Sequence, residues 1–310
     1  MEYNNLILTQ SATTIAHIGT KKPHSLFQNE LCTIAVCGDV FLNERATTAE
    51  DISKFFINNK KCIDTLYQQL SGQFWLVVFD VNNNELFLVN DHFGMQPCFY
   101  TIQNNALHIS DSLKKLKGVP ELSFSISEQA LFNYMYFHCI PSPNTIFEQV
   151  AKLEPGKAVI FELQGADSEI VVTEKLLYCP SFNQKKSVNN DSHKACLDVI
   201  EKAVTKHASD DSGAFLSGGL DSSSVSGMLA KSQSPAKTFS IGFTIDGYDE
   251  TPYAKLTAKH FNTQHEVLYL QPEQAAEEFV KVAQYFDEPF GNSSAMATYF
   301  CAKFAKHHGV

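Results

Sequence analysis

Short apolar runs separated by polar turns dominate the first half of the chain. Residues 73–79 form a near-continuous apolar run of strand-forming residues, so we expect both faces of this strand to be covered. Asn82-Asn83-Asn84 predicts a turn, and residues 85–89 predict the returning strand. Residues 97–109 predict a second hairpin that turns at Asn104-Asn105. Strands joined by such short turns are antiparallel.

A helix and one further strand follow. Residues 127–137 predict a helix opened by Ser127, with Ala130, Leu131 and Tyr134 on one face. The apolar run at 158–161 predicts the strand. This half of the chain is therefore expected to be rich in antiparallel β-structure.

The composition changes near residue 180. The stretch from about 180 to 192 is polar, which is typical of a linker. A chain of 310 residues is long enough for about two domains. We therefore place one domain at residues 1–180 and a second at residues 190–310.

After the linker, strand and helix patterns alternate. The expected strands and helices, in chain order, are a helix at 193–207, a strand at 214–216, a helix at 222–231, a strand at 238–243, a helix at 252–261, a strand at 265–270, a helix opened by Pro272 and a last helix from about Met296. This alternation predicts a parallel sheet with helices on its faces. The fold class is therefore a two-domain combination of α+β and α/β.

Charge and composition narrow the function classes. The net charge of −10 and the lack of a basic stripe argue against nucleic-acid binding. No apolar run approaches membrane-spanning length, and the first ten residues do not resemble a signal peptide. The eight cysteines are scattered without a CxxC pair, so we expect reduced, mostly buried thiols rather than zinc ligands. We expect a cytoplasmic protein.

The segment Ser217-Gly218-Gly219-Leu220-Asp221-Ser222 carries the candidate chemistry. It lies between an expected strand and an expected helix, where open α/β sheets place their ligands. The glycines allow a sharp turn and a close approach of oxygen atoms, and the following helix directs unpaired N–H groups towards an anion. Asp221 would repel phosphate alone, so we expect it to hold Mg²⁺. The alternative is a structural glycine turn.

The loop differs from other phosphate-binding loops. It lacks the lysine of GxxxxGK[ST] and it is not GxGxxG. A loop that holds the pyrophosphate end of ATP leaves the α-phosphate open to a substrate carboxylate. The expected products are an acyl-adenylate and pyrophosphate.

With these residues, the chain resembles the asparagine synthetase family, which joins a glutaminase-like domain to a PP-loop ATP domain. Matching segments in the second half are 215–223, 238–243, Tyr248-Asp249-Glu250, 258–266 and 286–290. In the first half they are Asp91-His92-Phe93-Gly94 with Pro97 and Tyr100, then Pro141, 145–147 and 153–156. The resemblance implies an N-terminal antiparallel Ntn-type sandwich. It also implies an incomplete C-terminal PP-loop domain of the adenine nucleotide α-hydrolase type.

The resemblance also implies an ATP site. Leu216 and Ile241 would border the adenine through main-chain atoms. Ser217, Gly218, Gly219 and Ser222 would hold the pyrophosphate, and Asp221 the Mg²⁺. For Glu250 and Asp287, a site role and a structural role as caps or ion pairs stay open.

The first half departs from the family pattern. The family's glutaminase uses a cysteine at position 2 as nucleophile, and this chain has Glu2 there. The family's N-G-E triplet appears as Cys37-Gly38-Asp39, and Cys32 is expected inside the fold. We expect glutamine hydrolysis to be lost, with Asp39 and Asp111 kept as structural residues.

The second departure is at the other end. The chain stops at Val310, where the family continues into a G-D-G-G-D-E element that completes the metal and adenylate site. We expect the chain to be truncated there, with a second chain as a candidate source of the missing C-terminal half.

Two functions follow from the sequence. The first is an asparagine synthase-like, ATP-dependent ligase that joins a small-molecule or peptide carboxylate to an amine or ammonia, without its own glutamine hydrolysis. Relatives without the cysteine include β-lactam synthetases and lasso-peptide cyclases, and asparagine formation from free ammonia stays open. The second is a nucleotide-binding pseudoenzyme or a half-enzyme that needs a partner chain.

Overall fold

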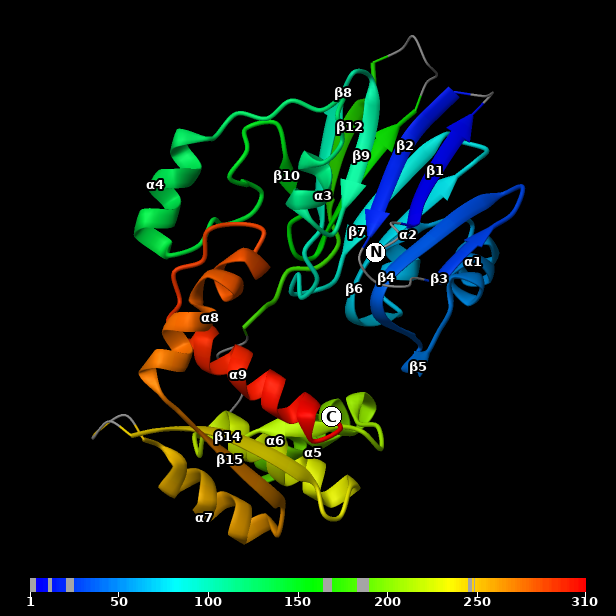
Figure 1. Cartoon of the computed structure of the whole chain (residues 1–310). Coiled ribbons are helices and arrows are strands. Elements are labelled where there is room, and N and C mark those ends of the chain that lie inside the picture. Colours follow the sequence, from blue (N-terminus) through cyan, green and yellow to red (C-terminus); the bar gives the residue numbers. More distant parts are fainter. Residues whose placement is uncertain are drawn as a thin grey trace. The chain divides into compact units, whose positions relative to one another are not determined.

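The structure is a computed structural model. It describes residues 4–10, 13–20, 25–163, 169–182, 190–244, 247 and 249–310. The chain divides into two compact units: one of Met1–Ser181 with Asp287–Gly291, and one of Phe182–Phe286 with Asn292–Val310 (Figure 1). In the part of the chain that is described, no helix combines the length and the apolar character needed to cross a membrane.

Two sheets form the body of the first unit. The five-stranded sheet has the order β1 (Asn4–Gln10), β2 (Thr13–Thr20), β9 (Ala106–Ser110), β8 (Phe99–Gln103) and β10 (Ala151–Lys152). The seven-stranded sheet has the order β12 (Val171–Leu176), β11 (Lys157–Glu162), β7 (Glu85–Asn90), β6 (Leu70–Asp80), β4 (Cys32–Leu42) and β3 (Ser25–Gln28), with β5 (Arg45–Ala46) paired to β4. Every pair is antiparallel except β2 with β9, which is parallel.

Both predicted hairpins are present. β6 and β7 pair from Trp75 opposite Asn90 to Asp80 opposite Glu85. β8 and β9 turn at Asn104 and Asn105, which both have left-handed backbone angles of the kind a tight hairpin turn requires. The antiparallel sheets expected from the first half of the chain are confirmed.

Strand β6 is covered on both faces, as its continuous apolar run predicts. Trp75, Val77 and Phe79 belong to a core cluster that they form with residues of β8, β9 and β11. The alternate residues Phe74 and Leu76 belong to a second cluster, under the helices α1 (Ala49–Asn58) and α2 (Ile63–Tyr67). The unit is therefore built in layers, because successive side chains of a strand point to opposite faces.

Two more helices complete the first unit, α3 (Leu113–Lys117) and α4 (Glu128–Phe137). Ser127 caps α4 as predicted, since its side chain accepts a hydrogen bond from the N–H of Ala130. Of the predicted face, however, only Ala130 is buried, and Leu131 is 43% exposed. In unit 1 this helix contributes little to the core.

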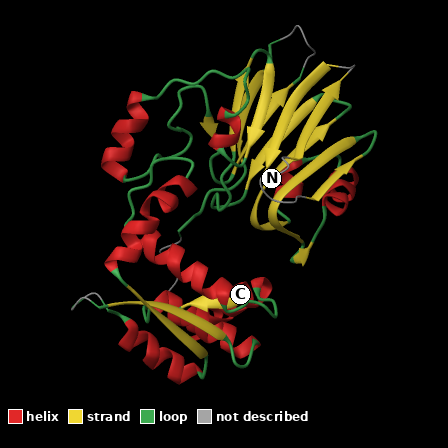
Figure 2. Cartoon of the chain, in the orientation of Figure 1, coloured by secondary structure: helices red, strands yellow, loops and turns green. Residues whose placement is uncertain are grey.

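The second unit contains a parallel sheet, as the alternation predicts. Its strands have the order β13 (Gly213–Phe215), β14 (Lys237–Phe243) and β15 (Gln264–Leu270). Its helices are α5 (Asn190–His207), α6 (Leu220–Ser232), α7 (Thr251–Phe261), α8 (Pro272–Tyr285) and α9 (Ser294–His307). Figure 2 shows helices on both sides of the strands. A mixed fold with antiparallel sheets and one parallel sheet is thus confirmed.

The helices of the second unit are only partly covered. α6 packs Leu229 on Ala214, α7 packs Ala254 on Leu216, and α9 packs Cys301 on Phe239. Large apolar side chains of α5 and α8 are exposed: Val199 is 66% exposed and Phe279 is 61% exposed. A sheet of three strands, one of them three residues long, has too little surface to cover all five helices.

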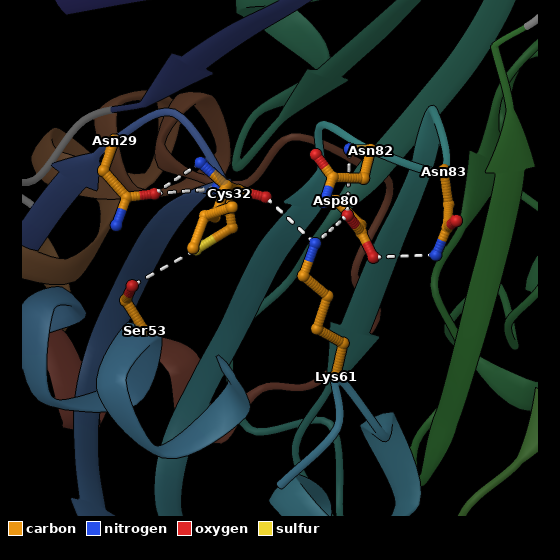
Figure 3. Close-up of polar contacts among 8 residues, drawn as sticks. Asn29, Cys32, Ser53, Lys61, Asp80, Asn82 and Asn83 are labelled. Carbon is orange, nitrogen blue, oxygen red and sulfur yellow. Dashed lines mark hydrogen bonds and ion pairs between the residues drawn. The ribbon is translucent and has the colours of Figure 1, made fainter. Parts of the chain in front are cut away.

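A polar cluster closes the β6–β7 hairpin (Figure 3). Asp80, with 2% of its side chain exposed, accepts hydrogen bonds from the N–H of Asn82 and from the side chain of Asn83. It also pairs with the Lys61 ammonium, which donates to the carbonyl of Leu31 as well. The buried carboxylate is therefore neutralised and hydrogen-bonded, which is the condition for tolerating a buried charge.

We predict that Asp80→Ala lowers the free energy of unfolding by about 2–4 kcal/mol, because it leaves the half-buried Lys61 ammonium without its anion. Denaturant unfolding measures this. Lys54→Ala is the matched control, since Lys54 forms an exposed pair with Glu50 and its loss is expected to leave stability unchanged within error. Equal effects of the two variants would contradict the role given to Asp80.

Candidate nucleotide site

The loop between β13 and α6 is the centre of the candidate site. β13 ends at Phe215, and α6 begins at Leu220 with Gly219 as its N-cap. The N–H of Leu216 donates to the carbonyl of Phe239 over 2.8 Å, which ties the start of the loop to β14. The first N–H groups of a helix have no partner within it, so the first turn of α6 offers donors to an anion.

Serine hydroxyls order this loop from within. The Ser217 and Ser222 hydroxyls lie 2.9 Å apart, and the N–H of Ser217 donates to the Ser222 hydroxyl over 3.2 Å. The N–H of Gly219 donates to the Ser217 hydroxyl over 3.3 Å. The Ser222 hydroxyl also donates to the carbonyl of Gly219 over 3.2 Å. Both hydroxyls are thus held at the N-terminal end of α6, where each could donate to a phosphate oxygen by rotating away from its partner within the loop.

Gly218 is fixed by its surroundings. Its φ of +86° lies in the left-handed region. A Cβ atom there would lie 2.6 Å from the Cβ of Tyr253 and 2.7 Å from the main-chain nitrogen of Ala254. The loop backbone therefore packs directly on the first turn of α7, and only glycine fits.

A cavity of about 330 Å³ lies beside the loop. Four of the predicted site residues line it: Leu216, Ser217, Ser222 and Ile241. One face of α9 forms another part of the wall, through Ser294, Ala297, Thr298 and Cys301. The volume is at the lower end of the range of small-molecule sites. Gly218, Gly219 and Asp221 belong to the same loop but are not part of this lining.

Leu216 and Ile241, the two residues expected to border the adenine, differ in whether their main-chain groups are free for a ligand. The Leu216 N–H is used by Phe239, and its carbonyl accepts a hydrogen bond from the Ser240 hydroxyl. The β13 ladder stops with Phe215 opposite Phe239. The main chain of Ile241 therefore extends past the last residue pair on that side, where a ligand can reach it.

Glu250 and Asp287 lie in different parts of the structure. Glu250 lines the cavity at the start of α7. Asp287 belongs to the first unit, where it accepts a hydrogen bond from the Ser112 hydroxyl over 2.9 Å. Asp287 therefore fits a structural role, and Glu250 remains a candidate for a role in the site. Tyr248, which matched the same family segment, lies outside the described residues.

Glu288, next to Asp287, is also held in the first unit. It forms an ion pair with Lys152 and accepts a hydrogen bond from the N–H of Ile146 over 3.1 Å. Burial raises the pKa of Glu288, and the Lys152 ammonium opposes that shift. This carboxylate therefore has a structural partner.

In the first unit, Cys32 and Asp111 both have side-chain partners. Cys32, fully buried in β4, lies 3.2 Å from the Ser53 hydroxyl, as expected for a cysteine inside the fold (Figure 3). Gly38 has a φ of +96° and Asp39 is exposed. Asp111 forms an ion pair with Lys115 over 3.0 Å. Glu2 lies outside the described residues.

Asp91 organises the turn that follows β7. It is 1% exposed, and its carboxylate accepts hydrogen bonds from the main-chain N–H groups of Phe74, Phe93 and Met95. This explains the aspartate of the D-x-x-G element as a backbone organiser rather than a catalytic group.

All eight cysteines are free thiols. Four are buried and three are exposed, so the expectation of mostly buried thiols is only half right. Cys301 in the cavity wall has its pKa raised to about 11 by burial, which keeps it protonated at neutral pH. It is therefore a wall residue rather than a nucleophile.

Among the described residues, no group of three or more His, Cys, Asp or Glu side chains is arranged to hold a metal ion. Asp221 is exposed at the start of α6. A single carboxylate beside a phosphate site fits Mg²⁺, because this ion takes one or two protein carboxylates and completes its shell with phosphate oxygens and water.

Sequence reasoning missed the contribution of α9 and of the polar residues in β14 and β15. The α9 residues that line the cavity have the spacing i, i+3, i+4 and i+7, which is visible in the sequence. Their small size, however, gives no signal of a ligand.

Comparisons with known proteins agree with this architecture. Residues 195–310 match the asparagine synthase family, and residues 47–171 match the glutamine amidotransferase domain. The chain is 31% identical over 242 residues to asparagine synthetase (glutamine-hydrolyzing) 1 of Bacillus subtilis (strain 168), which covers 77% of this chain and 37% of that protein. It is 32% identical over 268 residues to the putative asparagine synthetase (glutamine-hydrolyzing) 2 of Methanocaldococcus jannaschii, covering 85% and 51%.

The two matched regions define a protein that combines an amidotransferase-type part with a synthase-type part. The chain belongs to the asparagine synthetase family. It spans about half or less of the length of these curated relatives. Among solved structures, a glutamine phosphoribosylpyrophosphate amidotransferase from B. subtilis matches with 15% identity and a TM-score of 0.25, covering 82% of this chain and 52% of that chain; so low a score supports no further comparison.

We predict that Gly218→Ala destabilises the protein by about 2–4 kcal/mol, because the added Cβ meets the backbone of α7 and the backbone angle is strained. Thermal or denaturant unfolding measures this. The neighbouring Gly219→Ala is the control: its φ is −69° and its Cβ would lie 3.4 Å from the Ser217 hydroxyl, so stability is expected to change little. A stable Gly218→Ala protein would refute the packing described for the loop.

Proposed function

We propose that the chain is the nucleotide-binding part of an asparagine synthase-like ligase that adenylates a carboxylate and releases pyrophosphate. The observation that carries this is the Ser217–Ser222 loop at the N-terminal end of α6, beside a cavity closed by α9. The family membership supports an amide-forming ligase. The site supports the use of ATP, because it combines an anion-binding helix end with a partly apolar cavity.

Different residues of the site bind the adenine end and the pyrophosphate end of the nucleotide. Leu216 and Ile241 border the adenine, with Ile241 offering its main chain. Ser217, Gly218, Gly219 and Ser222 hold the pyrophosphate through hydroxyl and N–H donors. Asp221 holds Mg²⁺, which offsets the charge of the pyrophosphate.

The reaction has two steps. A carboxylate oxygen of the substrate attacks the α-phosphorus of ATP, and the bond to the β-phosphate oxygen breaks, so that pyrophosphate leaves. An amine then attacks the acyl carbon of the adenylate, loses a proton, and AMP leaves as the amide forms. Positioning of the reactants accounts for most of the rate gain that this chain's own residues can supply.

We propose that the amine does not come from glutamine hydrolysed by this chain. The first cysteine of the sequence, Cys32, is buried in the core and lies against Ser53. A buried, hydrogen-bonded thiol in a strand is not accessible to a glutamine side chain. The amine is therefore free ammonia or a group of the substrate itself, as in the β-lactam synthetase and lasso-peptide cyclase type of enzyme.

A second candidate is a half-enzyme that acts with a partner chain. In the described part of the second unit, β13 pairs only with β14, so no strand pairs with its other edge. Apolar side chains of α5 and α8 are also exposed. A polypeptide that carries the remainder of an asparagine synthase domain fits this edge, because sheet edges and apolar faces are normally covered.

Acid-dependent pyrophosphate release tests the proposal. The purified chain is incubated with Mg·ATP, glutamine and a panel of acids that includes aspartate, and pyrophosphate and glutamate are both measured. We expect pyrophosphate release that depends on one acid, with no glutamate formed. Release that requires added C-terminal synthase polypeptide would favour the half-enzyme. Glutamate formation would refute the loss of glutaminase activity, and no release under either condition would refute the ligase.

Asp221→Ala tests the nucleotide site itself. We predict that it weakens ATP binding in the presence of Mg²⁺ at least about 10-fold, because the metal loses its protein ligand. Isothermal titration calorimetry with and without Mg²⁺ measures this. Asp210→Ala, an equally exposed carboxylate before β13, is the control and is expected to bind ATP normally. Tight, Mg²⁺-dependent binding by Asp221→Ala would refute the loop assignment.

A further inference from the structure

A chain of polar side chains crosses the parallel sheet behind the cavity. The Thr263 and Thr238 hydroxyls lie 2.8 Å apart. The Thr238 hydroxyl lies 3.0 Å from Nδ1 of His265, and Nε2 of His265 lies 3.4 Å from the Ser240 hydroxyl. The Ser240 hydroxyl donates in turn to the carbonyl of Leu216. The chain thus runs from the loop before β15, through β14 and β15, to the first residue after β13.

The number of available hydrogens determines which group donates in each hydrogen bond of this series of polar side chains. The single hydroxyl hydrogen of Ser240 is used on the Leu216 carbonyl, so Nε2 of His265 must be the donor towards Ser240. In the neutral ring Nδ1 is then an acceptor, and Thr238 donates to it. Thr263 donates to Thr238. The chain therefore fixes one tautomer of His265, with the hydrogen on Nε2.

The surroundings keep this ring neutral. Burial lowers the pKa of His265, and the Lys255 ammonium acts in the same direction, while the Thr238 carbonyl and Glu266 raise it. Thr238 is fully buried and Ser240 is 4% exposed. Buried hydroxyls of this kind keep a defined hydrogen-bond pattern, because an unpaired partner is costly in a low-dielectric interior.

The last two members of the chain belong to the candidate site. Ser240 and Leu216 line the cavity, whereas His265 does not. Leu216 is also the residue from which the phosphate loop begins, and both of its main-chain groups are engaged by β14. A change at His265 can therefore reach the cavity wall through Ser240.

We propose that His265 is a positioning residue for nucleotide binding, which orients the Ser240 hydroxyl and thereby holds the Leu216 carbonyl and the start of the Ser217–Ser222 loop in place. This inference rests on the proposed function, since it concerns the affinity for ATP. His265 acts through the cavity wall and does not touch the ligand. Its ring is required for its hydrogen-bond pattern rather than for its charge.

The test compares His265→Ala with His265→Gln in the full chain, using titration calorimetry with Mg·ATP. We expect His265→Ala to weaken ATP binding about 5-fold, because Ser240 loses the donor that fixes its hydroxyl. His265→Gln can offer one donor and one acceptor and is expected to restore most of the affinity. His260→Ala is the matched control, since His260 is exposed on α7 and its ring packs edge-on against Phe261.

A double-mutant cycle separates positioning from general destabilisation. Ser240→Ala is expected to weaken ATP binding to a similar extent, and the double variant to be no weaker than either single variant, because both break the same chain. Additive losses, or a His265→Ala protein that unfolds earlier but binds ATP normally, would overturn the proposal. Nitrogen NMR provides a second readout: a neutral His265 with its hydrogen on Nδ1 would also overturn it.

The controls distinguish this proposal from the proposed function. If the unaltered protein does not bind ATP, the nucleotide site itself is wrong. If it binds ATP and His265→Ala binds equally well while folded, only the role of His265 is wrong.

Discussion

The parallel register of β13, β14 and β15 is the constraint on which the second unit depends. It brings the carboxyl ends of the strands to one edge, so that Leu216 follows β13 at the level of Ser240 and Ile241 in β14. The phosphate loop and the cavity wall start from this edge, and the polar chain through His265 runs from the amino ends of β14 and β15 to Leu216. Gly218 then adds the second requirement, since the loop reaches α7 only without a side chain at that position. Backbone geometry thus determines the position of the site, and the side chains supply its hydrogen-bonding and charged groups.

The first unit is governed by a different constraint, the burial of β6 on both faces. Trp75 and Phe74 belong to separate cores, so one strand supports the packing of a second sheet on one side and of two helices on the other. Such a strand cannot shift its register by one residue without exchanging the two cores. The ion pair of Asp80 with Lys61 lies at the end of this strand, where the hairpin begins.

The sequence was informative wherever one local pattern decided the outcome. The hairpin of β6 with β7, the cap at Ser127, the alternation of the second half and the loop at Ser217–Ser222 all follow from short-range rules. The parallel pairing of β2 with β9 could not be foreseen, because it joins segments about ninety residues apart without a local signal. Burial was overestimated at Leu131, since apolar residues on one face of a helix do not show that another element covers that face. The hydrogen-bonded group of Thr238, Ser240 and His265 could not be predicted from the sequence either. These three polar residues come from two strands, and they interact only because the strands lie side by side.

The segment Asp287–Gly291 shows that sequence domains and folding units differ in this chain. It comes from the synthase-type half, yet it is grouped with the first unit, where Glu288 neutralises Lys152 and accepts the N–H of Ile146. A polypeptide that ends at Ser181 would leave that ammonium without its carboxylate and that N–H without its acceptor. A polypeptide cut at the linker would therefore lack these two contacts of the first unit. These contacts can form only after residue 288 has been synthesised, more than one hundred residues after Ser181.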